Sequence, residues 1–347
     1  MNVFLRTALT LSIAVTGGLL FRAIGFPAPW LTGPTLVVAS AAVLGAPLLL
    51  PRPIVLAAPV LLGATMSSTV SPDTLSHLAE WPLSLIGLGA SLALVMWACS
   101  LYLQRIHGFD PATARFAAVP GSLPLVLALS MESKADVRQV AIAQTFRLAS
   151  LVVLLPISFT LLGIVPEGGA AGVLLGRAVS VPDLAILLTA GLGAGLLFAR
   201  LKVPAGYLFG AMCAGVLLYG SGAVKTGMPS WILIPGSLII ATVVGMSFAG
   251  VDVALLRRTL AASLGSLAVA VLMTTAIAAP VAALTGLPIA QIWLAFAPGG
   301  VETMTIMAFL LGVDPAFVGS HHIARFLALG ITIPLWVRAH LHRDVSR

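Results

Sequence analysis

The sequence predicts an all-α polytopic membrane protein made of two inverted-topology repeats. Each repeat has about five transmembrane helices and one Pro-Gly-interrupted helix, either re-entrant or broken. Three observations predict this class: an apolar composition, an internal sequence repeat and two interrupted apolar segments. Apolar residues make up 59% and charged residues 8% of the chain, with a mean hydropathy of +1.10, whereas soluble domains are about 25% charged.

The second half of the chain repeats the first. Residues 109–156 align without a gap on residues 287–334, an offset of 178 positions (287 minus 109), and nearer the N-terminus the offset is 177. Because a duplication of this length preserves a folding unit, we expect each half to fold alike. The matches include Pro120-Gly121 with Pro298-Gly299, Asp136 with Asp314, Arg147 with Arg325, Pro156 with Pro334, Gly18 with Gly195, Pro27-Ala28 with Pro204-Ala205, and Gly33 with Gly210.

Ten apolar stretches are long enough to be predicted as spans, since a membrane helix needs about 20 mainly apolar residues. The segment after Arg6 also fits a signal peptide, but it is the first helix of the repeat, so we keep it as a span. The predicted spans are 7–24, 30–48, 53–70, 82–103, 137–163, 184–199, 205–222, 231–249, 260–284 and 315–339. The predicted domains are repeat 1 (1–165), a connector (166–183), repeat 2 (184–340) and a basic tail (341–347).

Two further apolar segments, 111–131 and 289–311, are interrupted at their middle by Pro120-Gly121 and Pro298-Gly299. Proline removes a helical donor and glycine loosens the backbone, so each segment should break into two half-helices. A half-helix of roughly 9 residues rises about 13 Å, which reaches the middle of a membrane core about 30 Å thick. Each segment could therefore dip in and return, or cross as a broken helix.

Positive charge favours the re-entrant arrangement. With both segments re-entrant and the N-terminus cytoplasmic, 13 Lys and Arg residues fall inside and 3 outside, leaving Arg147 and Arg325 within helices. If both segments cross, 9 fall inside and 7 outside. Because cytoplasmic loops carry excess Lys and Arg, we expect a multi-pass protein of the bacterial inner (plasma) membrane with both termini cytoplasmic. Five spans per half is an odd number, so the second half should be inverted.

The two arginines are candidate substrate-binding residues. An arginine inside a span costs on the order of 3 kcal/mol and needs a partner. The neighbour three residues earlier is Gln144 in one half and His322 in the other. Each arginine could bind a substrate carboxylate, or could tie loop carbonyls or Glu302. Asp136 and Asp314 stand at the predicted helix starts, where we expect them to act as caps.

The interrupted segments supply the other candidates. Glu302 is the acid within the second segment and could carry protons, hold a cation, cap the half-helix or pair with Arg325. Backbone amides at the starts of half-helices attract anions. The candidate binding residues are therefore Arg147, Arg325, Gln144, His322, Gly121, Ser122, Gly299, Gly300, Glu302 and Thr303.

Other classes of site fit poorly. Cys99 and Cys213 lack metal-ligand spacing, and His321-His322 point about 100° apart on a helix, so we expect no metal and no cofactor. The basic residues are scattered rather than clustered, which argues against nucleic acid as a partner. The expected partners are a small-molecule solute, coupled to protons or sodium, and membrane lipid. The pattern also allows a homo-oligomer.

The G-L-L-F, P-A-x-x-L-x-G, P-G and R pattern of both halves resembles the bacterial AbrB family of integral membrane proteins, also described as an ammonia monooxygenase family. The unrelated soluble DNA-binding AbrB shares only the name. The resemblance covers almost the whole chain, most specifically residues 27–33 and 298–304, and implies a duplicated membrane domain. The family's acid after Pro-Gly-Gly falls at Thr303, one residue later than Glu302 here.

Interrupted helices in inverted repeats are typical of secondary transporters, whose binding sites lie near the midplane. The sequence therefore predicts alternating-access transport of a small solute, an organic anion, at the repeat interface. The alternative is a membrane-embedded regulator of gene expression that acts indirectly. An ammonia monooxygenase is the least favoured function, because six histidines show no convergent copper or iron spacing. We expect no enzymatic activity.

Overall fold

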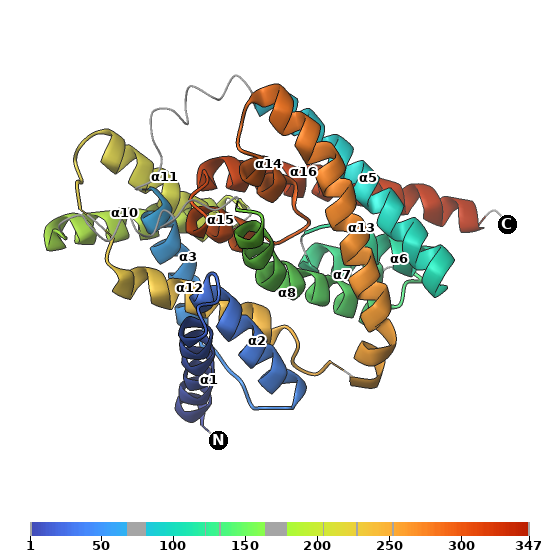
Figure 1. The fold of residues 1–347 in the computed structure, drawn as a ribbon, viewed down its shortest axis with the longest axis horizontal. Coiled ribbons are helices and arrows are strands. Elements are labelled where there is room, and N and C mark those ends of the chain that lie inside the picture. Colours follow the sequence, from blue (N-terminus) through green and yellow to red (C-terminus); the bar gives the residue numbers. More distant parts are fainter. Residues whose placement is uncertain are drawn as a thin grey trace. The chain divides into compact units, whose positions relative to one another are not determined.

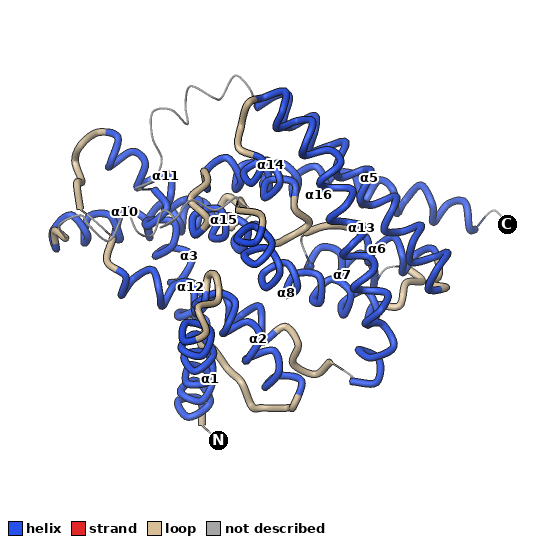
Figure 2. Tube along the Cα trace, viewed as in Figure 1, coloured by secondary structure: helices blue, strands red, loops and turns tan. Residues whose placement is uncertain are grey.

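The computed structural model describes residues 2–67, 81–121, 123–131, 133–163, 179–203, 205–226, 228–251 and 253–345. Fourteen helices and no strand occur in these stretches (Figures 1 and 2). The predicted all-α class is therefore confirmed for the described part of the chain. Ser122, one of the predicted binding residues, lies outside it.

Every predicted span coincides with a helix, and each Pro-Gly segment forms two short helices that end and begin at the predicted break. The first seven helices are α1 (Val3–Ala23), α2 (Pro29–Val43), α3 (Arg52–Ser67), α5 (Trp81–His107), α6 (Pro111–Ala118), α7 (Leu123–Met131) and α8 (Val137–Leu161). The next seven are α10 (Val181–Arg200), α11 (Gly206–Gly220), α12 (Ser230–Met246), α13 (Val253–Thr285), α14 (Ile289–Phe296), α15 (Val301–Leu310) and α16 (Pro315–Val345).

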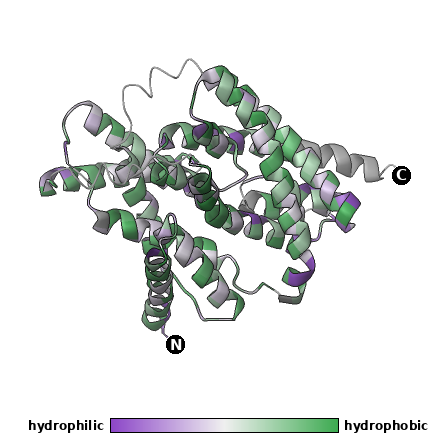
Figure 3. Cartoon of the chain, in the orientation of Figure 1, coloured by the Kyte–Doolittle hydropathy of each residue, from purple (hydrophilic) through white to green (hydrophobic). Residues whose placement is uncertain are grey.

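Five of the described helices are long and apolar enough to cross a membrane: α1, α5, α8, α10 and α13. In Figure 3, most of the length of these helices has the colour of hydrophobic residues. Four further predicted spans, α2, α3, α11 and α12, are apolar helices of 15 to 17 residues. Helices of that length extend only about 22–26 Å, less than the roughly 30 Å of a bilayer core. The long helices identify the chain as a membrane protein by length and composition.

Three of the predicted boundaries are wrong by five or more residues: the end of α2, the start of α13, and the end of α16, which lies at Val345 instead of residue 339. Helix α2 ends at Val43 instead of residue 48, because Gly45 has a φ of +79° that no helix can continue through. Helix α13 begins at Val253 instead of residue 260, and its first turns carry the exposed Arg257 and Arg258. A helix continues past the end of its apolar stretch wherever its polar residues are solvated, so hydropathy marks the apolar stretch alone.

Asp136 and Asp314 cap the helices that follow them, as predicted. The Asp136 carboxylate accepts hydrogen bonds from the backbone amides of Arg138 and Gln139 at 2.9 and 3.1 Å. The Asp314 carboxylate accepts from Ala316 and Phe317 at 2.8 and 3.2 Å. Each acid satisfies two amides that have no partner within the helix and complements the positive end of its dipole.

The chain folds into two compact units, and each draws on both predicted repeats, whose boundaries remain a prediction. The first unit comprises Met1–Leu78, Ala149–Gly250 and Val301–Gly319, and the second comprises Ala79–Leu148, Val251–Gly300 and Ser320–Arg347. The long helices α8 and α16 each contribute to both units, with their arginine-bearing parts in the second.

Small residues allow close packing between helices of the first unit. Helix α1 packs on α2, and α10 packs on α11. A side chain added at Gly33 would collide with the backbone of Gly17, and one added at Gly210 would collide with the backbone of Ala194. Such contacts bring helix backbones together where no aqueous hydrophobic effect drives association. The two helix pairs make these contacts at positions 177 residues apart (194 minus 17 and 210 minus 33).

In the second unit, the long helices α5 and α13 run side by side (Figure 1), and the short helices α6 and α14 pack on them. Phe116 and Val119 at the end of α6 form a buried cluster with Leu329 and Ile333 of α16. The end of α6 is thereby held beside the arginine-bearing part of α16.

Candidate functional site

Both predicted arginines are buried side chains of the second unit. Arg147 on α8 is 5% exposed, and Arg325 on α16 is 2% exposed. Each lies eleven residues after the capping aspartate of its helix (147 minus 136 and 325 minus 314), which places it three turns inside. A guanidinium buried this deeply must have its donors satisfied by the protein.

Arg147 donates to the carbonyls at the end of α6. Its Nη2 lies 2.6 Å from the Val119 oxygen, and its Nη1 lies 3.2 Å from that of Ala117. Gln144 supports it from the same face of α8. The Gln144 Oε1 accepts from Arg147 Nη2 at 2.6 Å, while its Nε2 donates to the Phe116 and Val119 carbonyls at 2.9 and 2.8 Å. We call this set the first arginine network.

Arg325 donates to the carbonyls at the end of α14 in the same manner. Its Nη1 and Nη2 each lie 2.5 Å from the oxygens of Ala297 and Gly299. His322 occupies the place of the glutamine: its Nε2 lies 2.9 Å from the Leu294 oxygen, and its Nδ1 lies 2.8 Å from Arg325 Nη2. Since Arg325 can only donate, Nδ1 accepts and Nε2 carries the proton, so this geometry requires a neutral imidazole. We call this set the second arginine network.

The two networks correspond at the repeat offset. Adding 178 to Phe116 gives Leu294, and adding 178 to Val119 gives Ala297; both networks bind these carbonyls. The bonds to Ala117 and Gly299 have no counterpart in the other network. Both arginines approach the C-terminal end of a short helix, where carbonyls lack helical partners and the dipole is negative. The predicted tie between arginine and loop carbonyls is therefore present in both halves.

Both Pro-Gly breaks meet at Arg325. The Gly299 carbonyl accepts from Arg325, and a Cβ built on Gly121 would lie 3.1 Å from Arg325 Nη2. Gly121 also has a φ of +84°, which favours glycine. The Pro-Gly break of the first interrupted segment thus packs closely on Arg325, which binds the Pro-Gly break of the second segment.

The arginines retain capacity for a ligand. Of the five N–H donors of a guanidinium, Arg325 uses three in hydrogen bonds to described residues: one to Ala297, one to Gly299 and one to His322. A carboxylate that replaced either carbonyl would also form a charge-assisted hydrogen bond, which is stronger than a neutral one. The arrangement can therefore hold an anion if the short helix end moves away.

The remaining predicted residues fall around the start of α15. Glu302 and Thr303 belong to the first unit, and Gly300 ends a segment of the second. Glu302 stands in the first turn of α15, where an acid complements the dipole; Thr303 is buried. Within the described part of its own unit, no hydrogen bond or ion pair involves the Glu302 carboxylate. The roles expected for these residues stay predictions.

The structure contains two polar arrangements that sequence reasoning missed. His321 is fully buried, and its Nε2 lies 2.8 Å from the Ser84 Oγ on α5. On α6, the Thr113 Oγ1 accepts from the backbone amide of Asp136 at 2.7 Å. Neither pairing has a sequence signal, because the partners are distant along the chain. Among the described residues no group of three or more His, Cys, Asp or Glu side chains could hold a metal ion.

Comparison with known proteins identifies the family. The family model described as "Transition state regulatory protein AbrB" matches residues 30–340. "Putative regulator AbrB" of Escherichia coli (strain K12) is 26% identical over 329 residues, covering 92% of this chain and 91% of the relative. "Uncharacterized protein YhjN" of Bacillus subtilis (strain 168) is 26% identical over 367 residues, covering 96% and 93%. The chain belongs to the AbrB family.

Proposed function

We propose that the chain is a secondary transporter that moves a small organic anion by alternating access between two inverted repeats. The observation that carries the proposal is the pair of arginine networks, each formed by a buried guanidinium and the end of a broken helix. Broken helix ends at repeat interfaces are where transporters of this kind bind solutes. A buried cation at such a place favours an anionic solute.

The networks also supply a two-state element. In the state that the structure shows, the Arg325 guanidinium donates hydrogen bonds to the carbonyls of Ala297 and Gly299. In a second state, the solute carboxylate takes their place and the short helix end moves. A ligand shifts such an equilibrium only by binding one state more tightly. Arginine, which cannot lose its proton, offers the same charge to the solute in both states.

The driving ion in this proposal is a proton or sodium. Glu302 is the candidate carrier, because a carboxylate at the start of α15 can take up a proton or hold a cation. We place the protein in the bacterial inner membrane with both termini in the cytoplasm, following the loop charges. The protein does no chemistry on its solute under this proposal.

Regulation is the second candidate function, favoured by the name of the Escherichia coli relative. A transporter can regulate gene expression indirectly, through the concentration of the metabolite that it moves. The two functions are therefore compatible, and transport is the activity that a purified protein can reveal.

Uptake by proteoliposomes tests the proposal. The full chain is reconstituted, a set of small radiolabelled carboxylates is offered, and uptake is measured with a proton gradient, a sodium gradient or none. We expect gradient-dependent uptake of at least one carboxylate and its loss in Arg147→Ala and Arg325→Ala. The conservative Arg325→Lys keeps the charge but loses the paired geometry, so it should retain part of the uptake. The proposal fails if no carboxylate moves and both alanine variants function normally in cells.

Cysteine labelling tests the inverted topology separately. In a Cys99→Ser and Cys213→Ser background, single cysteines are introduced as Asp73→Cys and Arg257→Cys, in loops that correspond in the two predicted repeats. A membrane-impermeant maleimide should label the two positions from opposite sides. Labelling of both from the same side would contradict the inversion.

A further inference from the structure

The two arginine networks meet at one short stretch of chain, residues 119–121. Arg147 Nη2 binds the Val119 carbonyl at 2.6 Å, and a Cβ built on Gly121 would lie 3.1 Å from Arg325 Nη2. Two residues of chain extend about 7 Å at most. The two guanidiniums are thus close enough for their charges to repel each other. All of these residues belong to the second unit, so the two networks present their donors in one place.

No carboxylate balances this pair of charges within the part of the second unit that the structure describes. The acids whose side chains are described there are Asp110 and Asp136, which are exposed and cap α6 and α8. Among the described residues, both arginines bind only backbone carbonyls and the side chains of Gln144 and His322. A buried charge without a counter-ion is costly. The charge to be balanced at this place is therefore two.

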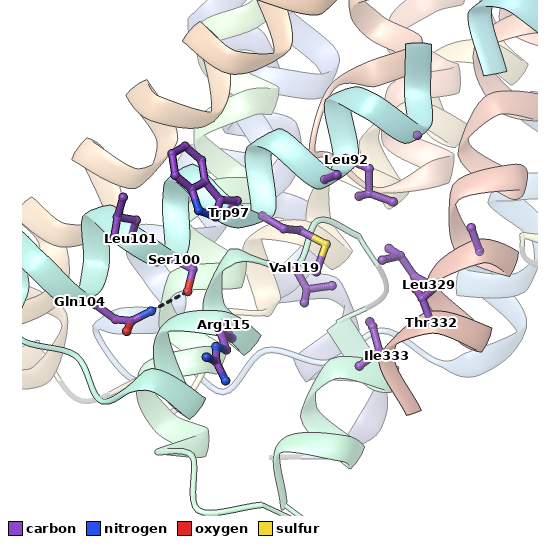
Figure 4. Close-up of a pocket in the computed structure, with 14 residues that line it drawn as sticks. Leu92, Trp97, Ser100, Leu101, Gln104, Arg115, Val119, Leu329, Thr332 and Ile333 are labelled. Carbon is purple, nitrogen blue, oxygen red and sulfur yellow. Dashed lines mark hydrogen bonds between the residues drawn. The ribbon is translucent and has the colours of Figure 1, made fainter. Parts of the chain in front are cut away.

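The end of α6 packs against both arginine-bearing helices. Val119 belongs to a buried cluster with Val140 of α8 and Leu329 of α16. Val119 and Leu329 also line a cavity of about 700 Å³ (Figure 4). Most of its lining is apolar, and its polar members come from α5, α6 and α16: Ser100, Gln104, Arg115 and Thr332. This cavity would give the end of α6 room to move when a carboxylate replaces the Val119 carbonyl on Arg147.

A solute with two carboxylates matches this pair of arginines better than a solute with one. A monocarboxylate would neutralise one guanidinium and leave the other charge buried without a counter-ion. Two separate monocarboxylates would each lose their freedom of motion on binding, whereas two linked carboxylates lose it once. Each carboxylate would form charge-assisted hydrogen bonds, which are stronger than the bonds to backbone carbonyls that they replace.

We propose that the two arginine networks form one binding site for a small dicarboxylate, with one carboxylate on Arg147 and the other on Arg325. This inference rests on the proposed function, because it names the class of solute that the same arginines would carry. The first carboxylate replaces the Val119 carbonyl, and the second replaces the carbonyls of Ala297 and Gly299. One solute molecule therefore releases the ends of α6 and α14 together.

Binding of dicarboxylates and their monomethyl esters to the full chain in detergent tests the proposal. Succinate, glutarate and adipate are each compared with the monomethyl ester of the same length, which carries one carboxylate instead of two. Isothermal titration calorimetry at constant ionic strength measures the Kd and the stoichiometry. For at least one length, the Kd of the dicarboxylate should be about ten- to hundred-fold lower than that of its ester, the ratio expected from one further bond between charged groups. One dicarboxylate should bind per chain.

Substitution of either arginine should remove this preference. In Arg147→Gln and in Arg325→Gln, one guanidinium remains, so the Kd of the dicarboxylate should approach that of its ester. Arg105→Gln is the matched control, because it removes the same charge from an exposed residue in the last turn of α5, and it should keep the preference. If a variant at either arginine fails to fold, the ratio measured on the wild type decides by itself.

Several results would overturn the proposal. These are equal affinities of the wild type for dicarboxylate and ester at all three lengths, no binding of any dicarboxylate, two dicarboxylates per chain, or an unchanged preference in both glutamine variants. The outcome is also distinct from that of the transport test. If dicarboxylate and ester bind equally and proteoliposomes take up both, transport stands and the dicarboxylate site fails. If a dicarboxylate binds with the expected preference but no carboxylate is taken up, transport fails and the dicarboxylate site stands.

Discussion

The two arginine networks bind equivalent carbonyls with different supporting side chains. In the first, Gln144 donates to Phe116 and accepts from Arg147; in the second, His322 donates to Leu294 and accepts from Arg325. A glutamine amide presents its donor and acceptor at every pH, whereas a histidine does so only while neutral. The second network therefore depends on a protonation state, and the first does not.

Removal of either arginine should lower the unfolding free energy more than any other substitution. The loss should be larger for Arg325 than for Arg147. Arg325→Ala leaves the Gly299 carbonyl and the His322 Nδ1 without their donor and removes the contact with Gly121, at a cost of roughly 2–4 kcal/mol in unfolding free energy. Arg147→Ala should cost about 1–3 kcal/mol, because the Val119 carbonyl keeps its bond from Gln144. Denaturant unfolding in detergent measures both. A larger loss for Arg147→Ala would show that the Gly121 contact is not important.

A side chain at Gly121 should have the next largest effect. Gly121→Ala combines a φ of +84° with a Cβ 3.1 Å from Arg325 Nη2, and we expect a cost of about 1–3 kcal/mol. Gly45→Ala is the matched control, since Gly45 has a φ of +79° and open space around a built Cβ. The difference in unfolding free energy between the two variants isolates the contact with Arg325. Equal costs would mean that backbone strain alone accounts for the loss.

Exchange of the two supporting side chains tests directly whether glutamine and histidine are equivalent in the networks. His322→Gln should keep both hydrogen bonds and change stability little, whereas Gln144→His should lose one of the two carbonyl bonds of Gln144, about 1 kcal/mol. Denaturant unfolding of each variant in detergent measures the two changes. A larger loss for His322→Gln than for Gln144→His would contradict this role of His322.

The sequence predicts which side chains and helix breaks belong to these networks. It does not predict which hydrogen bonds join them. The Pro-Gly dipeptides predict the broken helices, because proline and glycine act on the backbone locally. Gln144 and His322 could be named as partners, because residues three apart share a helix face. Which carbonyl each arginine binds depends on how α6 and α14 pack beside α8 and α16.

The smallest effects should come from the aspartates that begin the two arginine-bearing helices. Asp136→Asn and Asp314→Asn keep an oxygen for the capping bonds and lose only the charge, which should cost about 0.3–1 kcal/mol each. The Asp136 carboxylate also accepts from the Gln139 side chain at 3.0 Å, so its asparagine variant should lose slightly more. Asp136→Ala and Asp314→Ala remove the cap itself, at about 1 kcal/mol. Because the caps stand three turns from the arginines, each cost should add to that of Arg147→Ala or Arg325→Ala in a double variant. Strong non-additivity in α16 alone would show that its first turns and the second arginine network move together.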